Sequence, residues 1–196
     1  MPVYKESLEQ TIAPSIESLK KAMHTYARQG GTSSIMINDD GLQLLSEDER
    51  EARIQFYSNH DIGWVARPPH GHEGFIRAGR FKKASNMNYG LSLSLRMEEI
   101  LCELEAVPTQ NPFGDDDEVD LAGRALAVAV DETKGQARAR GGRALRMGEI
   151  ILIVDSDTQV PEDCFRDAAR ELAECPEVAI IQHESDGESH SISKYP

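Results

Sequence analysis

The alternation of helical stretches with short apolar runs constrains the fold of this 196-residue chain more than any other feature. Between Leu8 and Tyr26 apolar residues recur every three or four positions, which predicts an amphipathic helix. Further helices are predicted over 46–59, where an S-x-x-E capping box opens the pattern, around 91–104 and from 161 onward. Short apolar runs typical of buried strands occupy 34–37, 62–66, 150–154 and 178–182. Because strands alternate with helices, we expect an α/β fold with a mostly parallel sheet flanked by helices on both faces.

The charge of the chain narrows the class of ligand. The net charge is −13 and the pI is near 4.9, which argues against a nucleic-acid partner, because a phosphate backbone demands a basic face. A nucleotide remains compatible with this balance, since one small basic pocket suffices for it. The three cysteines form no C-x-x-C pair, no apolar run approaches the roughly 20 residues that span a bilayer, and the N-terminus has no signal-peptide core. We therefore expect a cytoplasmic protein.

Acidic residues follow two of the predicted strands. Asp39 and Asp40 come after one apolar run, and Asp155 and Asp157 come after another. Ligands of parallel α/β sheets bind beyond the carboxyl ends of the strands. Two carboxylates one residue apart can hold a hard divalent cation that keeps open positions for phosphate oxygens. A solvated turn is the alternative at both places, since Asp and Ser are ordinary turn formers.

A basic loop leads into the third helix. It ends in the sequence K-K-A-S-N-M-N, which contains Lys83 and Asn86. Cations and amides near a helix N-terminus suit a phosphate or sugar hydroxyls, and a solvated basic loop is the alternative. His70 and His72 in the preceding loop are not expected to form a metal pair, and Trp64 is expected in the core.

Four motifs in the same order resemble those of family 2 glycosyltransferases, the GT-A-fold group that includes cellulose, chitin and hyaluronan synthase-like enzymes. They are P-V-Y-K-E at 2–6, I-N-D-D-G at 37–41, K-A-S-N-M-N at 83–88 and V-D-S-D-T at 154–158. The third departs from the family's K-A-G-N-L-N by a serine in place of glycine. The resemblance implies a GT-A, Rossmann-like fold and inverting sugar transfer from a UDP-sugar to an acceptor hydroxyl.

The resemblance also implies roles around the nucleotide. Tyr4 and Glu6 would lie beside the base and ribose, and Asp40 would accept a hydrogen bond from the uracil ring. Asp39 would support the turn that carries Asp40.

Further roles concern the diphosphate and sugar. Lys83 would sit near the diphosphate, and Asn86 belongs to the same nucleotide-sugar-binding element. Asp155 would face the ribose and, with Asp157, an Mg²⁺ or Mn²⁺ ion. The implied partners are a UDP-sugar donor and a carbohydrate acceptor, and full-length relatives are membrane-associated, with the catalytic domain facing the cytosol.

The sequence departs from the family pattern after residue 186. The later E-D motif that supplies the general base is not found, nor is Q-x-x-R-W, and no catalytic residue can be named. We expect a truncated donor-binding fragment, incomplete in its acceptor half. It would comprise one domain over 1–186, an insertion at about 108–142 and an unstructured tail at 187–196.

Two other functions stay open. A donor-binding remnant without turnover would fit the missing base motif. A haloacid-dehalogenase-like phosphohydrolase also places D-x-D after an apolar strand, with the first Asp as nucleophile. That pattern wants Thr two residues after the second Asp, where this chain has Gln159.

Overall fold

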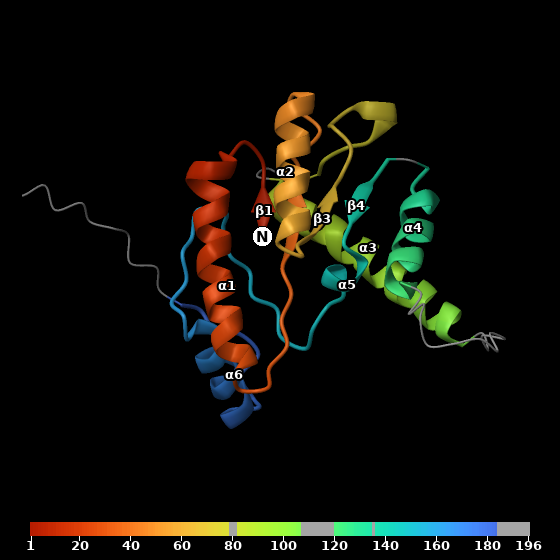
Figure 1. The fold of residues 1–196 in the computed structure, drawn as a ribbon. Coiled ribbons are helices and arrows are strands. Elements are labelled where there is room, and N and C mark those ends of the chain that lie inside the picture. The colour runs from red at the N-terminus through yellow and green to blue at the C-terminus, as the bar shows by residue number, and fades with distance from the viewer. Residues whose placement is uncertain (79–81, 107–119, 135, 184–196) are drawn as a thin grey trace, which may run out of the picture.

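The structure, a computed structural model, describes residues 1–78, 82–106, 120–134 and 136–183. A four-stranded sheet of order β1-β2-β3-β4 lies at its centre (Figure 1). The strands are β1 (Pro2–Val3), β2 (Met36–Asp39), β3 (Gly63–Ala66) and β4 (Arg138–Arg140). The first three are parallel and β4 runs antiparallel to β3. The expected α/β class with a mostly parallel sheet is confirmed.

Helices cover both faces of this sheet. They are η1 (Leu8–Ile12), α1 (Ala13–Ala27), α2 (Glu47–Asn59), η2 (His72–Gly74), α3 (Lys83–Glu105), α4 (Leu121–Glu132), α5 (Gly142–Leu145) and α6 (Cys164–Glu174). Alternation along the strands assigns the faces. Ile37 and Trp64 pack with α1 and α2, whereas Val65 packs with α3 and α4. The three parallel strands of this three-layer arrangement end toward the top of Figure 1.

Local sequence signals account for the first two helices. Ile12, Ile16 and Leu19 are buried, as the periodicity predicts. Ser46 caps α2 through a complete capping box with Glu49, so that helix begins where the sequence predicts. The predicted strand at 62–66 is confirmed within one residue as β3. The predicted strand at 34–37 is shifted to 36–39, because polar Asn38 and Asp39 continue the strand with β1 as their partner.

The predicted strand at 150–154 is wrong. Val154 is buried against α1 and α6, but residues 150–153 form no strand and their side chains are 39–66% exposed. The neighbouring edge offers little to pair with, because β1 has two residues and one of them, Pro2, has no N–H to donate. The predicted strand at 178–182 is also wrong, and Ile180 is 84% exposed. Because residues 150–154 do not join the sheet, residues 178–182 have no strand there with which to pair.

The segment expected as an insertion contributes to the fold where it is described. The segment contains α4, whose buried residues Ala125, Leu126 and Ala129 pack against α3. β4 then extends the sheet beside β3. Residues 107–119, with the acidic run, and the tail at 187–196 lie outside the described residues. That the segment is an insertion stays a prediction. Within the described residues, no helix is long and apolar enough to cross a membrane.

Candidate functional site

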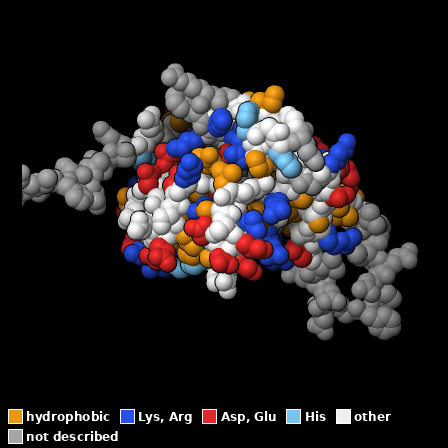
Figure 2. Space-filling model, turned by 90° about the horizontal axis from the view of Figure 1, so that it is seen from above, with side chains coloured by type: hydrophobic (Ala, Val, Ile, Leu, Met, Phe, Trp, Pro, Cys, Tyr) orange, Lys and Arg blue, Asp and Glu red, His pale blue; other side chains and the backbone are white. Residues whose placement is uncertain are grey.

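The loops that follow β1 and β2 meet at the carboxyl edge of the sheet. The Asp40 N–H donates to the Val3 carbonyl at 3.0 Å. A Cβ added at Gly41 would lie 1.5 Å from the Tyr4 carbonyl oxygen, so the close approach of the two loops requires glycine at this position. The Tyr4 side chain is 43% exposed beside this contact. Two of the sequence motifs therefore lie side by side at this edge. Figure 2 views the molecule from above, and acidic and basic side chains are intermixed on that face.

The Asp39 carboxylate is fully buried and holds the β2 turn together. It accepts hydrogen bonds at 3.0 Å from the N–H groups of Gly41 and Leu42, at 2.8 Å from the Tyr57 hydroxyl and at 3.2 Å from Arg53 Nη1. Burial raises the pKa of Asp39, and the Arg53 guanidinium and the Tyr57 hydroxyl oppose that rise. Asp39 is thus anchored inside the protein, away from solvent.

Arg53 links the turns after β1 and β2. Besides Asp39, it donates through Nη2 to the Glu6 carbonyl at 2.6 Å. The Glu6 carboxylate in turn accepts the Tyr4 N–H and fixes the loop that carries the tyrosine. Sequence reasoning missed Arg53 and Tyr57. Their spacing of four residues on α2 puts them on one helix face, which is the signal that could have marked them as a buried polar pair.

Asp40 forms a buried ion-pair cluster. Its two carboxylate oxygens accept from Arg67 Nε and Nη2 at 2.8 Å each, and Arg77 Nη2 lies 3.7 Å from Oδ1. All three side chains are less than a tenth exposed. Burial lowers the pKa of Arg77, and the Asp40 carboxylate opposes that fall. Two guanidinium groups on one carboxylate leave this cluster with a net positive charge.

Arg67 also reaches the start of α3. It donates to the Ser85 hydroxyl at 2.7 Å and to the Lys82 carbonyl at 3.0 Å. Ser85 is the serine that replaces the glycine of the family element. Lys82 is the N-cap residue of α3 and has a left-handed φ of 60°. The Asn86 side chain donates to the Asn38 carbonyl at 2.9 Å. The start of α3 is therefore fixed against the ends of β2 and β3.

Lys83 joins this edge to the second acidic turn. Its ammonium group donates to Asp155 Oδ1 at 2.7 Å, across 72 positions of sequence, and both side chains are 54% exposed. Two motifs singled out in the sequence are thus in direct contact.

The turn that carries Asp155 and Asp157 is held by its backbone on α1. Ser156, between them, is buried, and its carbonyl accepts from the Ser15 hydroxyl at 2.8 Å. Farther on, the Val160 N–H donates to the Ser18 hydroxyl at 3.1 Å. Both carboxylates are exposed on either side of the buried serine. The backbone is therefore anchored while the acidic groups face solvent.

The chemistry of this donor set fits a hard divalent cation in part. Two exposed carboxylates can supply two oxygen ligands, and Mg²⁺ is commonly bound by one or two carboxylates together with substrate phosphates and water. Within the described residues, no group of three or more His, Cys, Asp or Glu side chains could hold a metal ion. A cation at Asp155 and Asp157 would need the remaining ligands from a phosphate and water.

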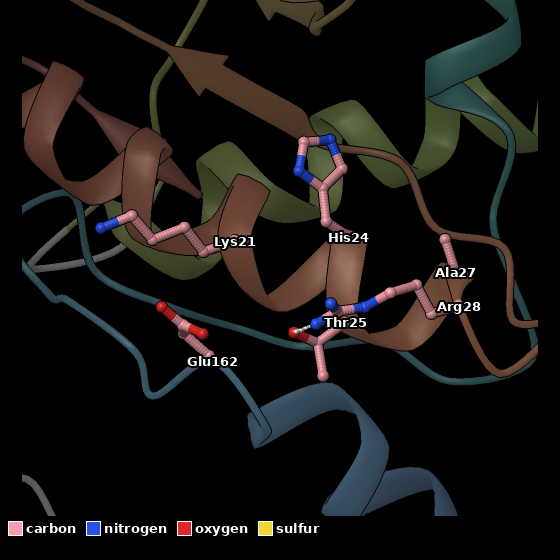
Figure 3. A pocket seen from close by; sticks show the side chains of 6 residues that line it. All are labelled: Lys21, His24, Thr25, Ala27, Arg28 and Glu162. Atoms are coloured by element: carbon pink, nitrogen blue, oxygen red, sulfur yellow. Dashed lines mark hydrogen bonds between the residues drawn. The ribbon is translucent and has the colours of Figure 1, made fainter.

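A separate hollow lies between α1 and the loop before α6. It has a volume of about 530 Å³ and is lined by Lys21, His24, Thr25, Ala27, Arg28 and Glu162 (Figure 3). The motif residues are not among those that line it. The hollow is open and its charges are mixed, so the candidate site stays at the carboxyl edge of the sheet.

A family model matches part of the chain. The family model described as glycosyl transferase family group 2 matches residues 150–189. That stretch contains Asp155, Asp157 and α6 and is a short part of the chain. No curated protein and no solved structure matches.

Proposed function

We propose that this chain is the nucleotide-sugar-binding part of a glycosyltransferase that takes a sugar from a UDP-sugar. The observation that carries the proposal is the contact between Lys83 and Asp155. One residue belongs to the K-A-S-N element, and the other lies in the stretch that matches the glycosyl transferase family model. A cation paired with an exposed acidic turn at the carboxyl edge of a parallel sheet is suited to a diphosphate and its metal ion.

The proposed site divides between nucleoside and diphosphate. Tyr4 and Glu6 flank the base and ribose, beside the turn that Asp39 holds. Each carboxylate oxygen of Asp40 uses one lone pair on Arg67 and keeps another, which a base N–H could take. The hydrogen bonds from Arg67 then fix the orientation of the Asp40 carboxylate toward the base.

The diphosphate would lie between α3 and the second acidic turn. Lys83 neutralises phosphate charge, and Asn86 supports the first turn of α3 through Asn38. Asp155 and Asp157 would hold Mg²⁺ or Mn²⁺, which stabilises a leaving diphosphate. Transfer proceeds with inversion to a hydroxyl of a carbohydrate acceptor, as in polysaccharide synthases, and requires a general base.

Calorimetric titration with UDP in the presence of Mn²⁺ tests the proposal. We expect Asp155→Ala and Asp157→Ala to weaken UDP binding by about tenfold or more, because each removes a charged ligand. Asp131→Ala is the matched control, since it removes an exposed carboxylate on α4, away from the motifs. A folded wild-type chain that binds no UDP, or equal binding by all variants, would overturn the proposal.

A release assay separates transfer chemistry from binding. Sustained, Mn²⁺-dependent release of UDP from a panel of UDP-sugars is expected of a working transferase. Tight UDP binding without release would instead establish a donor-binding protein without turnover.

A further inference from the structure

One of the two carboxylate oxygens of Asp155 is already in contact with a positive charge. Lys83 Nζ lies 2.7 Å from Asp155 Oδ1, a distance typical of a charge-assisted hydrogen bond. A divalent cation on the same carboxylate would meet a positive charge a few ångströms away, and like charges at that range repel. Cation binding through Oδ1 therefore requires the ammonium group to move, and binding through the other oxygen is opposed by its charge.

The backbone and the side chain at Lys83 differ in how tightly they are held. The α3 backbone beside Lys83 is fixed, because the Lys82 carbonyl accepts from both Arg67 and the Asn86 N–H. The Lys83 side chain is a flexible, half-exposed point charge, and exposed ion pairs are weak. The ammonium group can thus leave Asp155 without disturbing the helix that carries it.

We infer that Lys83 is an exchangeable counter-ion of Asp155, which it releases to the divalent cation when a nucleoside diphosphate arrives. The inference rests on the proposed function and adds to it the order in which the diphosphate and the cation find their protein partners. The diphosphate takes the ammonium group, the freed carboxylate takes the cation, and each ligand strengthens the binding of the other. In the absence of nucleotide, Lys83 occupies Asp155 and keeps cation affinity low.

The contrast with Arg67 supports this assignment. Arg67 holds Asp40 through two hydrogen bonds and is almost fully buried, so that pair cannot open without leaving a buried charge without its partner. Lys83 holds Asp155 through one contact at the surface. An exchange of partners is inexpensive in the second pair and costly in the first.

The first experiment measures Mn²⁺ affinity without nucleotide, from the electron paramagnetic resonance signal of free Mn²⁺. Lys83→Met should raise the affinity about two- to fivefold, the range that an exposed ion pair of up to about 1 kcal/mol allows. Lys82→Met is the matched control, because it removes the neighbouring positive charge and leaves the Asp155 contact intact. Equal effects of the two substitutions, or no gain in Lys83→Met, would overturn the inference.

The second experiment repeats the Mn²⁺ titration with saturating UDP. The wild type should bind Mn²⁺ more tightly with UDP than without it, and Lys83→Met should lose most of that difference, while Lys82→Met keeps it. Unchanged coupling in Lys83→Met overturns the inference but leaves the proposed function standing, provided that Asp155→Ala weakens UDP binding as expected above. A wild-type chain that binds neither Mn²⁺ nor UDP overturns both.

Discussion

The two acidic turns of this chain look alike in sequence and differ in structure. Each follows an apolar run and each carries two carboxylates. In the first turn, Asp39 and Asp40 are buried and held by guanidinium groups. In the second, Asp155 and Asp157 are exposed, and Asp155 contacts the movable side chain of Lys83.

The difference indicates which carboxylates can exchange their present partners for a ligand. The buried Asp39 carboxylate, with its full set of donors, is part of the scaffold, since losing any donor costs free energy. An exposed carboxylate on an anchored backbone can exchange partners at little cost. The first turn therefore shapes the proposed site, and the second carries the carboxylates that we propose bind the cation.

The largest expected effect contrasts Asp39 with Asp155 in stability. Asp39→Ala leaves the Arg53 guanidinium buried without its partner, which should lower the free energy of unfolding by about 3–5 kcal/mol. Asp155→Ala removes an exposed pair and should change it by less than about 1 kcal/mol. Urea unfolding followed by the fluorescence of buried Trp64 measures both. Similar losses of unfolding free energy in the two variants would show that the two turns do not differ in this way.

A smaller effect is expected at Tyr57, which donates to Asp39 at 2.8 Å. Tyr57→Phe removes a hydrogen bond to a charged group and should cost about 2 kcal/mol at pH 7. Burial, and then the Asp39 charge, raise the pKa of Tyr57 well above its ordinary value. The raised pKa means that this contribution is complete below about pH 10 and falls as the pH rises from there, because the unfolded chain ionises first.

The measurement is the free energy of unfolding at pH 7, 9 and 10.5. Wild type should lose stability between the last two values, and Tyr57→Phe should lose less over the same interval. Tyr26→Phe is the control, since Tyr26 packs edge-on against Phe165 and is only partly buried. Parallel alkaline losses in the wild type and Tyr57→Phe would show that the Asp39 network does not hold the hydroxyl.

Local patterns predict the parts of the fold that depend on neighbours in sequence. The stripe through Ile12, Ile16 and Leu19 and the capping box at Ser46 each involve residues three or four apart, and both are confirmed. The core position of Trp64 follows from its short apolar run.

The partners of the site residues depend on contacts that no local pattern contains. Asp40 and Arg67 are 27 positions apart and meet because β2 and β3 are adjacent. Arg67 could be read from sequence as the end of a strand, but its place as the partner of Asp40 and Ser85 could not. The Lys83–Asp155 pair spans 72 positions, and no local pattern contains it either.

Residues 150–153 give the smallest expected effect and the most direct test of structure against sequence. The sequence predicts a buried strand there, whereas the Ile153 side chain is 66% exposed and the next residue, Val154, is 8% exposed. Ile153→Asn should therefore change the free energy of unfolding by less than about 0.5 kcal/mol. Val154→Asn, the adjacent control, places an amide in the core and should cost about 3 kcal/mol. Because strand side chains alternate between faces and both faces of a central strand are buried, a comparable loss in Ile153→Asn would mean that this run pairs within the sheet in solution.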